Sequence, residues 1–398
     1  MIELSDRINA MEESATIAMS RKSRELKAEG KDVITLSLGE PDFNTPDFIK
    51  EAASQAMKDN FTYYTPVPGY LDLRQAISKK FKRDNNLDYS PEQIVVSTGA
   101  KQSIANVVLS LINEGDEVII PAPYWVSYLE IVKVAQGKPV IVNAGIENDF
   151  KLSGKELEAA ITDKTKLIIF STPCNPTGSV YSKEELVGIA EVLERYPNVV
   201  IIADEIYEHI NFTSKHESLA QFEEIKNQVV TVNGVSKAWA MTGWRLGYIG
   251  ASEKIAKACT KMQGQFTSGT SSISQKAAIA AMEADPAVLK DMIAAFEGRR
   301  KLVLDALNEI EGVKTNIPEG AFYVFPDVSY FYGKSYNGRK INNGSDLAMY
   351  LLDEALVALV TGEAFGDPNC IRISYATSEE VLTEAMRRIR EALENLSE

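Results

Sequence analysis

The sequence predicts an α/β protein whose mostly parallel sheet is covered by helices on both faces. Short runs rich in Val and Ile, each bounded by Gly, Pro or Asn, indicate buried strands. Amphipathic stretches of helical length separate these runs, and strands that alternate with helices build parallel sheets. The chain of 398 residues is also too long for one compact core, so we expect a large and a small domain.

The middle of the chain supplies the predicted sheet and the helices that cover it. Strands are expected over 94–98, 117–121, 166–171, 199–204 and 228–233. Helices are expected over 101–112, 124–135 and 182–195. Ser182 and Glu185 have the spacing of a capping box, which favours a helix that begins at this point.

The pattern changes near residue 285, where the alternation of strands and helices ends. A long helix is expected over 287–309, a strand over 321–325 and a closing helix over 379–396. The first forty residues contain one predicted helix, and the stretch 330–344, rich in Gly, Asn, Ser and Lys, predicts an exposed loop. We therefore expect a large domain at 46–285 and a smaller α+β domain built from 1–45 and 286–398.

Composition narrows the classes of partner and compartment. The chain has 42 basic and 56 acidic side chains, a net charge of -14 and no basic run, which disfavours nucleic acids and anionic membranes as partners. Its three cysteines are too widely spaced for a disulfide framework or a zinc site, and its two histidines lack a third metal ligand. No segment has the length of a signal-peptide core or a membrane span, so we expect a cytoplasmic protein without a bound metal.

Polar residues follow two of the predicted strands. Asp204 ends the strand at 199–204, and Ser236 and Lys237 come shortly after the strand at 228–233. The carboxyl ends of parallel strands are the edge at which α/β proteins bind ligands. Arg245 lies in a Met-Thr-Gly-Trp-Arg run that suggests a buried anion site. Taken singly, each residue also has an ordinary structural explanation, such as a helix cap or a surface charge.

Further motifs occur in register with these residues. They are Gly-Glu-Pro-Asp-Phe at 39–43, Tyr64 before Thr-Pro, Asn-Pro-Thr-Gly at 175–178 and Arg-Ile-Ser-Tyr-Ala at 372–376. From about residue 14 to residue 376, the chain therefore resembles the class I pyridoxal-phosphate-dependent aminotransferases, and bacterial aspartate aminotransferases in particular. The resemblance implies a fold-type I pyridoxal-phosphate enzyme with pyridoxal 5'-phosphate as its cofactor.

The resemblance implies roles at the cofactor that agree with side-chain chemistry. Lys237 would form a Schiff base with the cofactor aldehyde and then act as a base beside the substrate Cα. Asp204 would hold a proton on the pyridine nitrogen, and Tyr207 and Asn175 would bind the phenolate oxygen. Trp125 would stack on the ring, and both Trp125 and Asn175 would border the substrate. The residues implied for the phosphate are Ser236, Arg245, Gly99, Ala100 and, from a neighbouring subunit, Tyr64, so a homodimer is expected.

The substrates implied are an amino acid and a 2-oxo acid. Arg372 and Gly39 would hold the α-carboxylate, a bidentate task that suits arginine. Lys101 and Thr16 match the branch that resembles bacterial and thermophile aspartate aminotransferases, in which these positions contact the side-chain carboxylate. The helix dipole disfavours a cation at a helix start, and an anionic ligand accounts for Lys101 there. L-aspartate and 2-oxoglutarate are therefore the expected substrate pair.

Three alternatives stay open. The substrate could instead be an aromatic amino acid or prephenate, and the same lysine and aspartate would serve a pyridoxal-phosphate lyase. A regulator that binds the cofactor without catalysis would carry an appended DNA-binding segment, whereas the family pattern begins almost at once here.

The chain departs from the family pattern at two places. Cys174 stands where an asparagine is commoner in the family, and 265–268 has no match for the arginine that another branch takes from the neighbouring subunit.

Overall fold

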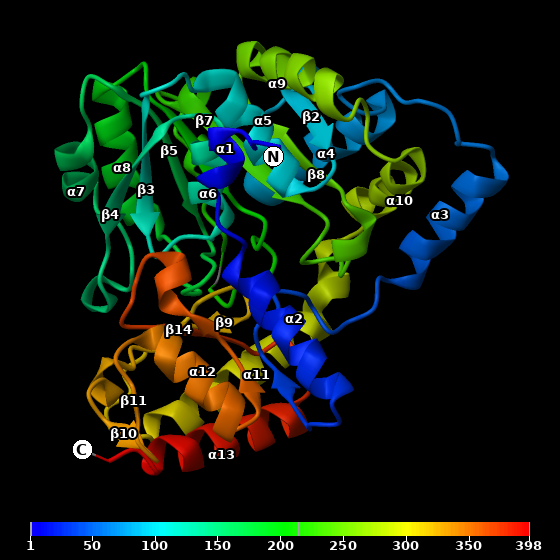
Figure 1. Cartoon of the computed structure of the whole chain (residues 1–398). Helices are drawn as coiled ribbons and strands as arrows, with labels where there is room; N and C mark the ends of the chain where they lie inside the picture. The colour runs from blue at the N-terminus through cyan, green and yellow to red at the C-terminus, as the bar shows by residue number, and fades with distance from the viewer. Residues whose placement is uncertain (1, 214, 398) are drawn as a thin grey trace.

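A seven-stranded sheet forms the centre of the computed structural model, which describes residues 2–213 and 215–397 (Figure 1). Strands β4, β3, β5, β6 and β7 are parallel, and β8 pairs antiparallel with both β7 and β2. Their spatial order is β2 (Ile94–Ser97), β8 (Gly247–Gly250), β7 (Val229–Gly234), β6 (Val200–Asp204), β5 (Thr165–Ser171), β3 (Glu117–Ala122) and β4 (Lys138–Asn143).

Helices cover both faces of this sheet because alternate strand residues point to opposite sides. In β5, Leu167 and Ile169 enter one apolar cluster while Ile168 and Phe170 enter the other. The helices of the first face are α5 (Ala100–Leu111), α6 (Ser127–Val134) and α9 (Glu253–Phe266). Those of the second face are α4 (Leu71–Asn85), α7 (Gly154–Ala160), α8 (Lys183–Arg195) and α10 (Ser272–Glu283), with α3 (Asp47–Lys58) packed on α10.

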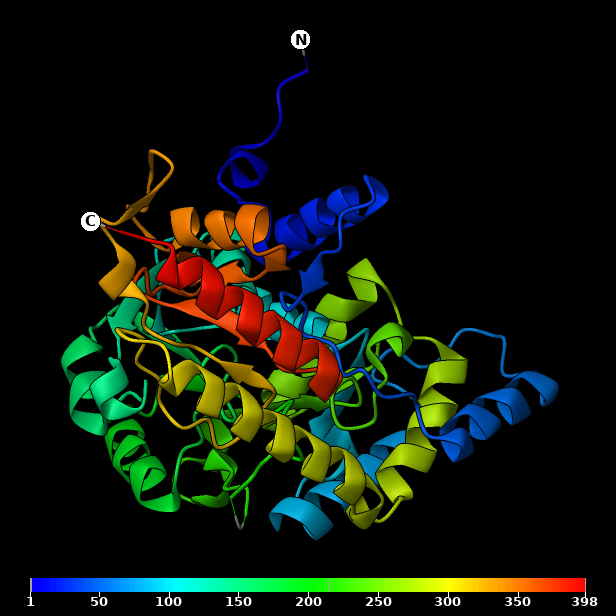
Figure 2. The ribbon, with the colours of Figure 1, turned by 90° about the horizontal axis from the view of Figure 1, so that it is seen from below.

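The segment 15–35 and the C-terminal part of the chain, 290–397, come together in the lower half of Figure 1. Strand β1 (Ile34–Thr35) pairs with β12 (Val357–Ala358), and β14 (Ile371–Ser374) lies between β13 (Val360–Thr361) and β9 (Tyr323–Val324). The helices around these strands, seen from below in Figure 2, are α2 (Ala15–Ala28), α11 (Lys290–Asn308), α12 (Gly344–Glu354) and α13 (Glu379–Glu394).

The structure confirms the predicted strands and helices of the central sheet and corrects several boundaries. The capping box forms, because the Ser182 hydroxyl accepts from Glu185 N–H at 3.3 Å and Ser182 N–H donates to Glu185 at 2.7 Å. The helix expected over 124–135 begins only at Ser127, since Tyr124 N–H donates to the carbonyl of Phe365 at 2.9 Å. Strands β4 and β8 and helices α3, α4, α7, α9 and α10 were not predicted.

The terminal regions differ more from the expectation. The first forty residues contain a short helix α1 (Asp6–Asn9) in addition to α2. A 3-10 turn, Pro286–Leu289, precedes α11, and the strand expected over 321–325 is shorter. The predicted exposed loop contains a hairpin, β10 (Ser335–Tyr336) and β11 (Arg339–Lys340), and the buried Ile341 ties it to the core. No helix among the described residues combines the length and apolar character needed to cross a membrane.

Candidate active site

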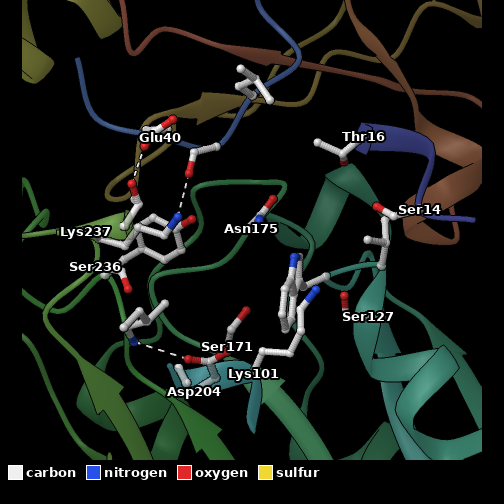
Figure 3. A pocket seen from close by; sticks show the side chains of 18 of the residues that line it. Ser14, Thr16, Glu40, Lys101, Ser127, Ser171, Asn175, Asp204, Ser236 and Lys237 are labelled. Atoms are coloured by element: carbon white, nitrogen blue, oxygen red, sulfur yellow. Dashed lines mark hydrogen bonds between the residues drawn. The ribbon is translucent and has the colours of Figure 1, made fainter. Parts of the chain in front are cut away.

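A pocket of about 340 Å³ lies at the carboxyl ends of the parallel strands (Figure 3). Strand β6 delivers Asp204, the turn after β7 delivers Ser236 and Lys237, and the start of α5 delivers Lys101. Segments from both chain ends close the pocket on the opposite side. The predicted site residues that line it are Thr16, Gly39, Ala100, Lys101, Trp125, Asn175, Asp204, Tyr207, Ser236, Lys237, Arg245 and Arg372.

Asp204 is a buried carboxylate without a cationic partner within hydrogen-bonding reach among the described residues. The hydroxyl of Tyr128 donates to one carboxylate oxygen at 2.7 Å, and Ile206 N–H donates to the other at 3.3 Å. Burial raises the pKa of Asp204 to about 6, although both hydrogen bonds oppose this rise. The side chain is thus held in place and favours a ligand that brings a positive charge or a proton.

Lys237 presents its amine to the same space. Its Nζ donates to the carbonyl of Gly39 at 2.5 Å and lies 5.5 Å from the centre of the Tyr207 ring. Burial, followed by the nearby Arg372 cation, lowers the pKa of Lys237 to about 8. A substantial neutral fraction near neutral pH makes this amine a nucleophile and a base.

Arg372 is a fully buried guanidinium in strand β14. Its Nη1 donates to Asn175 Oδ1 at 2.9 Å, its Nη2 donates to the carbonyl of Ser37 at 2.6 Å, and its Nε has no partner within the described chain. Burial lowers the pKa of Arg372, so the environment does not compensate its charge. Such a cation at a pocket wall is prepared for a carboxylate ligand.

Two tyrosine hydroxyls form the floor near Lys237. Tyr207 and Tyr323 share a hydrogen bond of 2.8 Å, and the Arg372 guanidinium lies 4.6 Å from the Tyr323 ring centre. Burial raises the pKa of both phenols, so both remain neutral donors. A Cβ at position 39 would collide with the Tyr323 hydroxyl, which explains why glycine is needed at Gly39.

An anion cradle forms where α5 begins. The Arg245 guanidinium lies so close to Gly99 that a Cβ on Gly99 would approach Nη2 to 2.5 Å, and Gly99 itself has a φ of +86°. Nη1 of Arg245 donates to the carbonyl of Thr242 at 2.7 Å. The first turn of α5 has N–H groups without intrahelical acceptors, and the Ser236 hydroxyl lies in the same pocket.

The opposite end of the pocket is polar. Lys101 Nζ lies 4.9 Å from the centre of the Trp125 ring, and burial, followed by Arg245, lowers the pKa of Lys101. Figure 3 shows Thr16, Ser14 and Ser127 on the same side of the pocket as Lys101. One cation and three hydroxyl groups therefore border this end.

Two predicted site residues do not line the pocket, and two important residues were not predicted. Gly99 lies behind the guanidinium of Arg245, and Tyr64 projects from the surface with 99% of its area exposed. Tyr128, which holds Asp204, and Tyr323, which contacts Arg372, were missed. Tyr128 follows Trp125 by three residues at the start of α6, which could have indicated the former, whereas the place of Tyr323 depends on the pairing of β9 with β14.

Comparison with known proteins gives the family of the chain. The family model for aminotransferase class I and II matches residues 31–389. A protein of Rickettsia bellii named probable aspartate/prephenate aminotransferase is 50% identical over 396 residues, which cover 99% of each chain. The chain therefore belongs to the class I and II aminotransferases.

Solved structures agree over the whole length. The crystal structure of the aspartate aminotransferase from Rhizobium meliloti superimposes with a TM-score of 0.97 at 43% identity and covers 100% of both chains. The aspartate aminotransferase from Thermus thermophilus with maleate gives a TM-score of 0.93 at 38% identity, covering 98% of this chain and 100% of that one. The fold is the α/β fold-type I architecture of aminotransferases, and the protein is a transaminase.

Proposed function

We propose that this chain moves an amino group between L-aspartate, or a related amino acid, and a 2-oxo acid such as 2-oxoglutarate, with pyridoxal 5'-phosphate bound to Lys237. The observation that carries this proposal is the convergence of three groups in one pocket. They are an amine of lowered pKa on Lys237, the buried acid Asp204 and the buried, uncompensated guanidinium of Arg372.

The residues of the pocket fit pyridoxal phosphate. The cradle of Arg245, Ser236 and the first turn of α5 would hold the phosphate, since it offers a planar guanidinium, a hydroxyl and free N–H groups. Asp204 would accept the N–H of a protonated ring, because its pKa is raised and no cation of the described residues lies within hydrogen-bonding reach. Tyr207 and the amide nitrogen of Asn175 would donate to the phenolate, as Asn175 Oδ1 already serves Arg372.

Pyridoxal phosphate supplies an aldehyde for amines and a ring that draws electrons from the substrate Cα. This chain supplies the positions and the proton transfers. Gly39 orients the Lys237 amine through a 2.5 Å hydrogen bond. Once free of the cofactor, this amine would take the proton from the substrate Cα and would deliver it to the carbon of the former cofactor aldehyde. Arg372 and the backbone of Gly39 would fix the α-carboxylate and thereby aim the Cα–H bond at Lys237.

The polar end of the pocket supports a dicarboxylic substrate. Lys101 has no carboxylate partner among the described residues, and Thr16 reaches the same end from helix α2. A substrate that places its second carboxylate here would pair one carboxylate with Lys101 and the other with Arg372. The same hydroxyl-rich wall also suits prephenate, which carries a second carboxylate and a hydroxyl, so prephenate is the second candidate acceptor.

The proposal includes a homodimer with shared active sites. Tyr64 and Tyr63 are 99% and 80% exposed, an unusual state for neighbouring aromatic residues, and Phe266 at the end of α9 is 66% exposed. A second copy that covers this surface would bring its Tyr64 to the anion cradle. We also place the protein in the cytoplasm, and we divide it into a large domain, 46–285, and a small domain built from 1–45 and 286–398.

A panel of amino donors and acceptors tests the proposed function. Aspartate and glutamate should react fastest with 2-oxoglutarate, oxaloacetate or prephenate, measured as transfer of ¹⁵N from donor to product by mass spectrometry. Alanine and phenylalanine should react more slowly. Release of ammonia without need for an acceptor would identify a lyase instead, and absence of both reactions in cofactor-loaded protein would refute the proposal.

A further inference from the structure

The turn at 204–208, which consists of the last residue of β6 and the four residues after it, has two faces with different surroundings. Asp204 and Tyr207 face the pocket, whereas Glu205 and Glu208 point into the protein and are buried. Behind this turn lies an ion cluster, by which we mean Lys80, Arg83, Asp84, Asn85, Glu205, Glu208, His209, His216 and Ser218. The cluster contains both histidines of the chain, and none of its members lines the pocket.

Each carboxylate oxygen of the two glutamates has a partner. Glu205 accepts from the Ser218 hydroxyl at 2.6 Å and pairs with His216 Nε2 at 3.0 Å. Glu208 accepts from Asn85 Nδ2 at 2.8 Å and pairs with the Lys80 ammonium, which is 1% exposed. The turn that delivers the pocket residues is therefore tied at two points to helix α4 and to the segment around 216–218.

The charges of the cluster balance when His216 carries a proton. Lys80 pairs with Glu208, and Arg83 lies on Asp84 at 2.5 Å. Burial disfavours a charged His216, but the adjacent Glu205 outweighs it and raises the pKa of His216. Burial lowers the pKa of the neighbouring His209, which therefore stays neutral among these ions. Ligand atoms of Glu205, Glu208 and His216 lie within 4.8 Å of one another, and Lys80 already supplies the cation that such a site requires.

Stability alone does not account for such a cluster. Replacing a buried ion pair with apolar residues of similar size is often neutral or stabilising, whereas the directional bonds of a paired carboxylate fix one orientation. In this protein, both paired carboxylates sit on the short turn that also carries Asp204 and Tyr207. We propose that the ion cluster is a positioning device, in which Glu205 and Glu208 hold the turn so that Asp204 and Tyr207 keep their places in the pocket. This inference rests on the proposed function.

Two variants and a matched control test the proposal in cofactor-loaded dimer. Glu208→Gln keeps the shape and removes the charge, and Lys80→Met/Glu208→Leu removes the pair without leaving an unpaired buried ion. Glu117→Gln is the control, because Glu117 is also a buried carboxylate of the sheet, bonded to Lys138 and Thr162, but lies at the amino end of β3, away from the pocket. Thermal unfolding of the cofactor-free proteins reports whether each variant folds.

Both cluster variants should lower kcat by about 10²-fold, the loss that a displacement of about 1 Å produces, while KM for aspartate changes little. They should also shift the pH at which the bound cofactor changes its absorbance, since Asp204 and Tyr207 act on that proton. The control should match the wild type in both readouts. A purely structural role would lower the unfolding temperature and leave this midpoint unchanged.

The outcomes separate the two proposals. If the double variant folds and matches the wild type in kcat and absorbance midpoint, the positioning role is wrong. The same conclusion follows if the control shifts as far as the cluster variants. If the wild type binds the cofactor but transfers no amino group, the proposed function fails, while a shifted midpoint in the variants still supports positioning. If the wild type binds no pyridoxal phosphate, both proposals fall.

Discussion

Asp204→Asn should make the cofactor-free chain more stable and at the same time remove most of its transaminase activity. Asparagine keeps the shape of the side chain and can still accept a hydrogen bond from Tyr128. It does not carry the charge that burial makes unfavourable. The stability gain and the loss of activity have one cause, namely a carboxylate kept in a place that suits a cationic ligand better than it suits the empty protein.

The size of the gain follows from the pKa of Asp204. Its folded-state pKa of about 6 lies above the ordinary 3.8, so the folded chain binds the proton more tightly and stability falls as pH rises between these values. Above pH 6 the difference corresponds to ~3 kcal/mol, at 1.36 kcal/mol for each pH unit. An unfolding entropy of about 2.1 cal/mol/K per residue then gives a rise in Tm of about 3–4 °C for Asp204→Asn.

The assay is thermal unfolding of cofactor-free wild type and Asp204→Asn between pH 4 and pH 7.5. The advantage of the variant should be full at pH 7.5, about half as large at pH 5 and only about a fifth as large at pH 4. Glu117→Gln is the control of opposite sign, because hydrogen bonds from Thr162 and Lys138 lower the pKa of Glu117 and its neutralisation should not stabilise. An unchanged or lower Tm for Asp204→Asn at pH 7.5, or a gain at pH 4 as large as that at pH 7.5, would refute the reasoning.

Three further predictions concern substrate binding and assembly. Arg372→Lys should lower kcat/KM for all amino acids alike by about 10²–10⁴-fold, since it removes two charge-assisted hydrogen bonds of about 1.5–3 kcal/mol each. Arg300→Lys is the control, because the Arg300 guanidinium also stacks on an aromatic ring, 4.6 Å from the centre of Phe212. This control should leave the steady-state rates unchanged. Lys101→Ala should lower kcat/KM for aspartate and glutamate about tenfold to a hundredfold and leave kcat/KM for alanine and phenylalanine unchanged. An equal loss for all donors would contradict the proposed preference for acidic substrates. Sedimentation should show a homodimer, and Tyr64→Phe should weaken the binding of pyridoxal phosphate measured by fluorescence quenching; a fully active monomer, or unchanged affinity in the variant, would contradict shared sites.

The sequence was sufficient to predict five of the seven strands of the central sheet and the residues at the carboxyl ends of β6 and β7. Apolar runs mark buried strands, and the parallel arrangement brings their ends together, so Asp204 and Lys237 were expected at one edge. Strand β8 escaped prediction because Gly247–Gly250 is short and bounded by glycine, and it pairs antiparallel within an otherwise parallel neighbourhood. Local patterns do not report which strand a short segment pairs with.

Contacts between distant segments account for what the sequence could not predict in the pocket. Tyr323 meets Arg372 because β9 pairs antiparallel with β14, a register that neither segment shows alone. The 330–344 stretch has the composition of a loop, yet Ser335 N–H donates to the carbonyl of Ser397 at 2.7 Å and fixes a hairpin there. The partners of Glu208 likewise come from a distant segment, helix α4, so the ion cluster has no local sequence signature.

Chemical trapping on Lys237 tests the central claim most directly. Cofactor-loaded protein is reduced with sodium borohydride, which makes the bond between a lysine and pyridoxal phosphate permanent, and the labelled peptide is mapped by mass spectrometry. The account predicts one label per chain on Lys237, and no label on that peptide in Lys237→Ala, which should turn over at least about 10³-fold more slowly. A label on another lysine, or a fully loaded and active Lys237→Ala protein, would contradict the account.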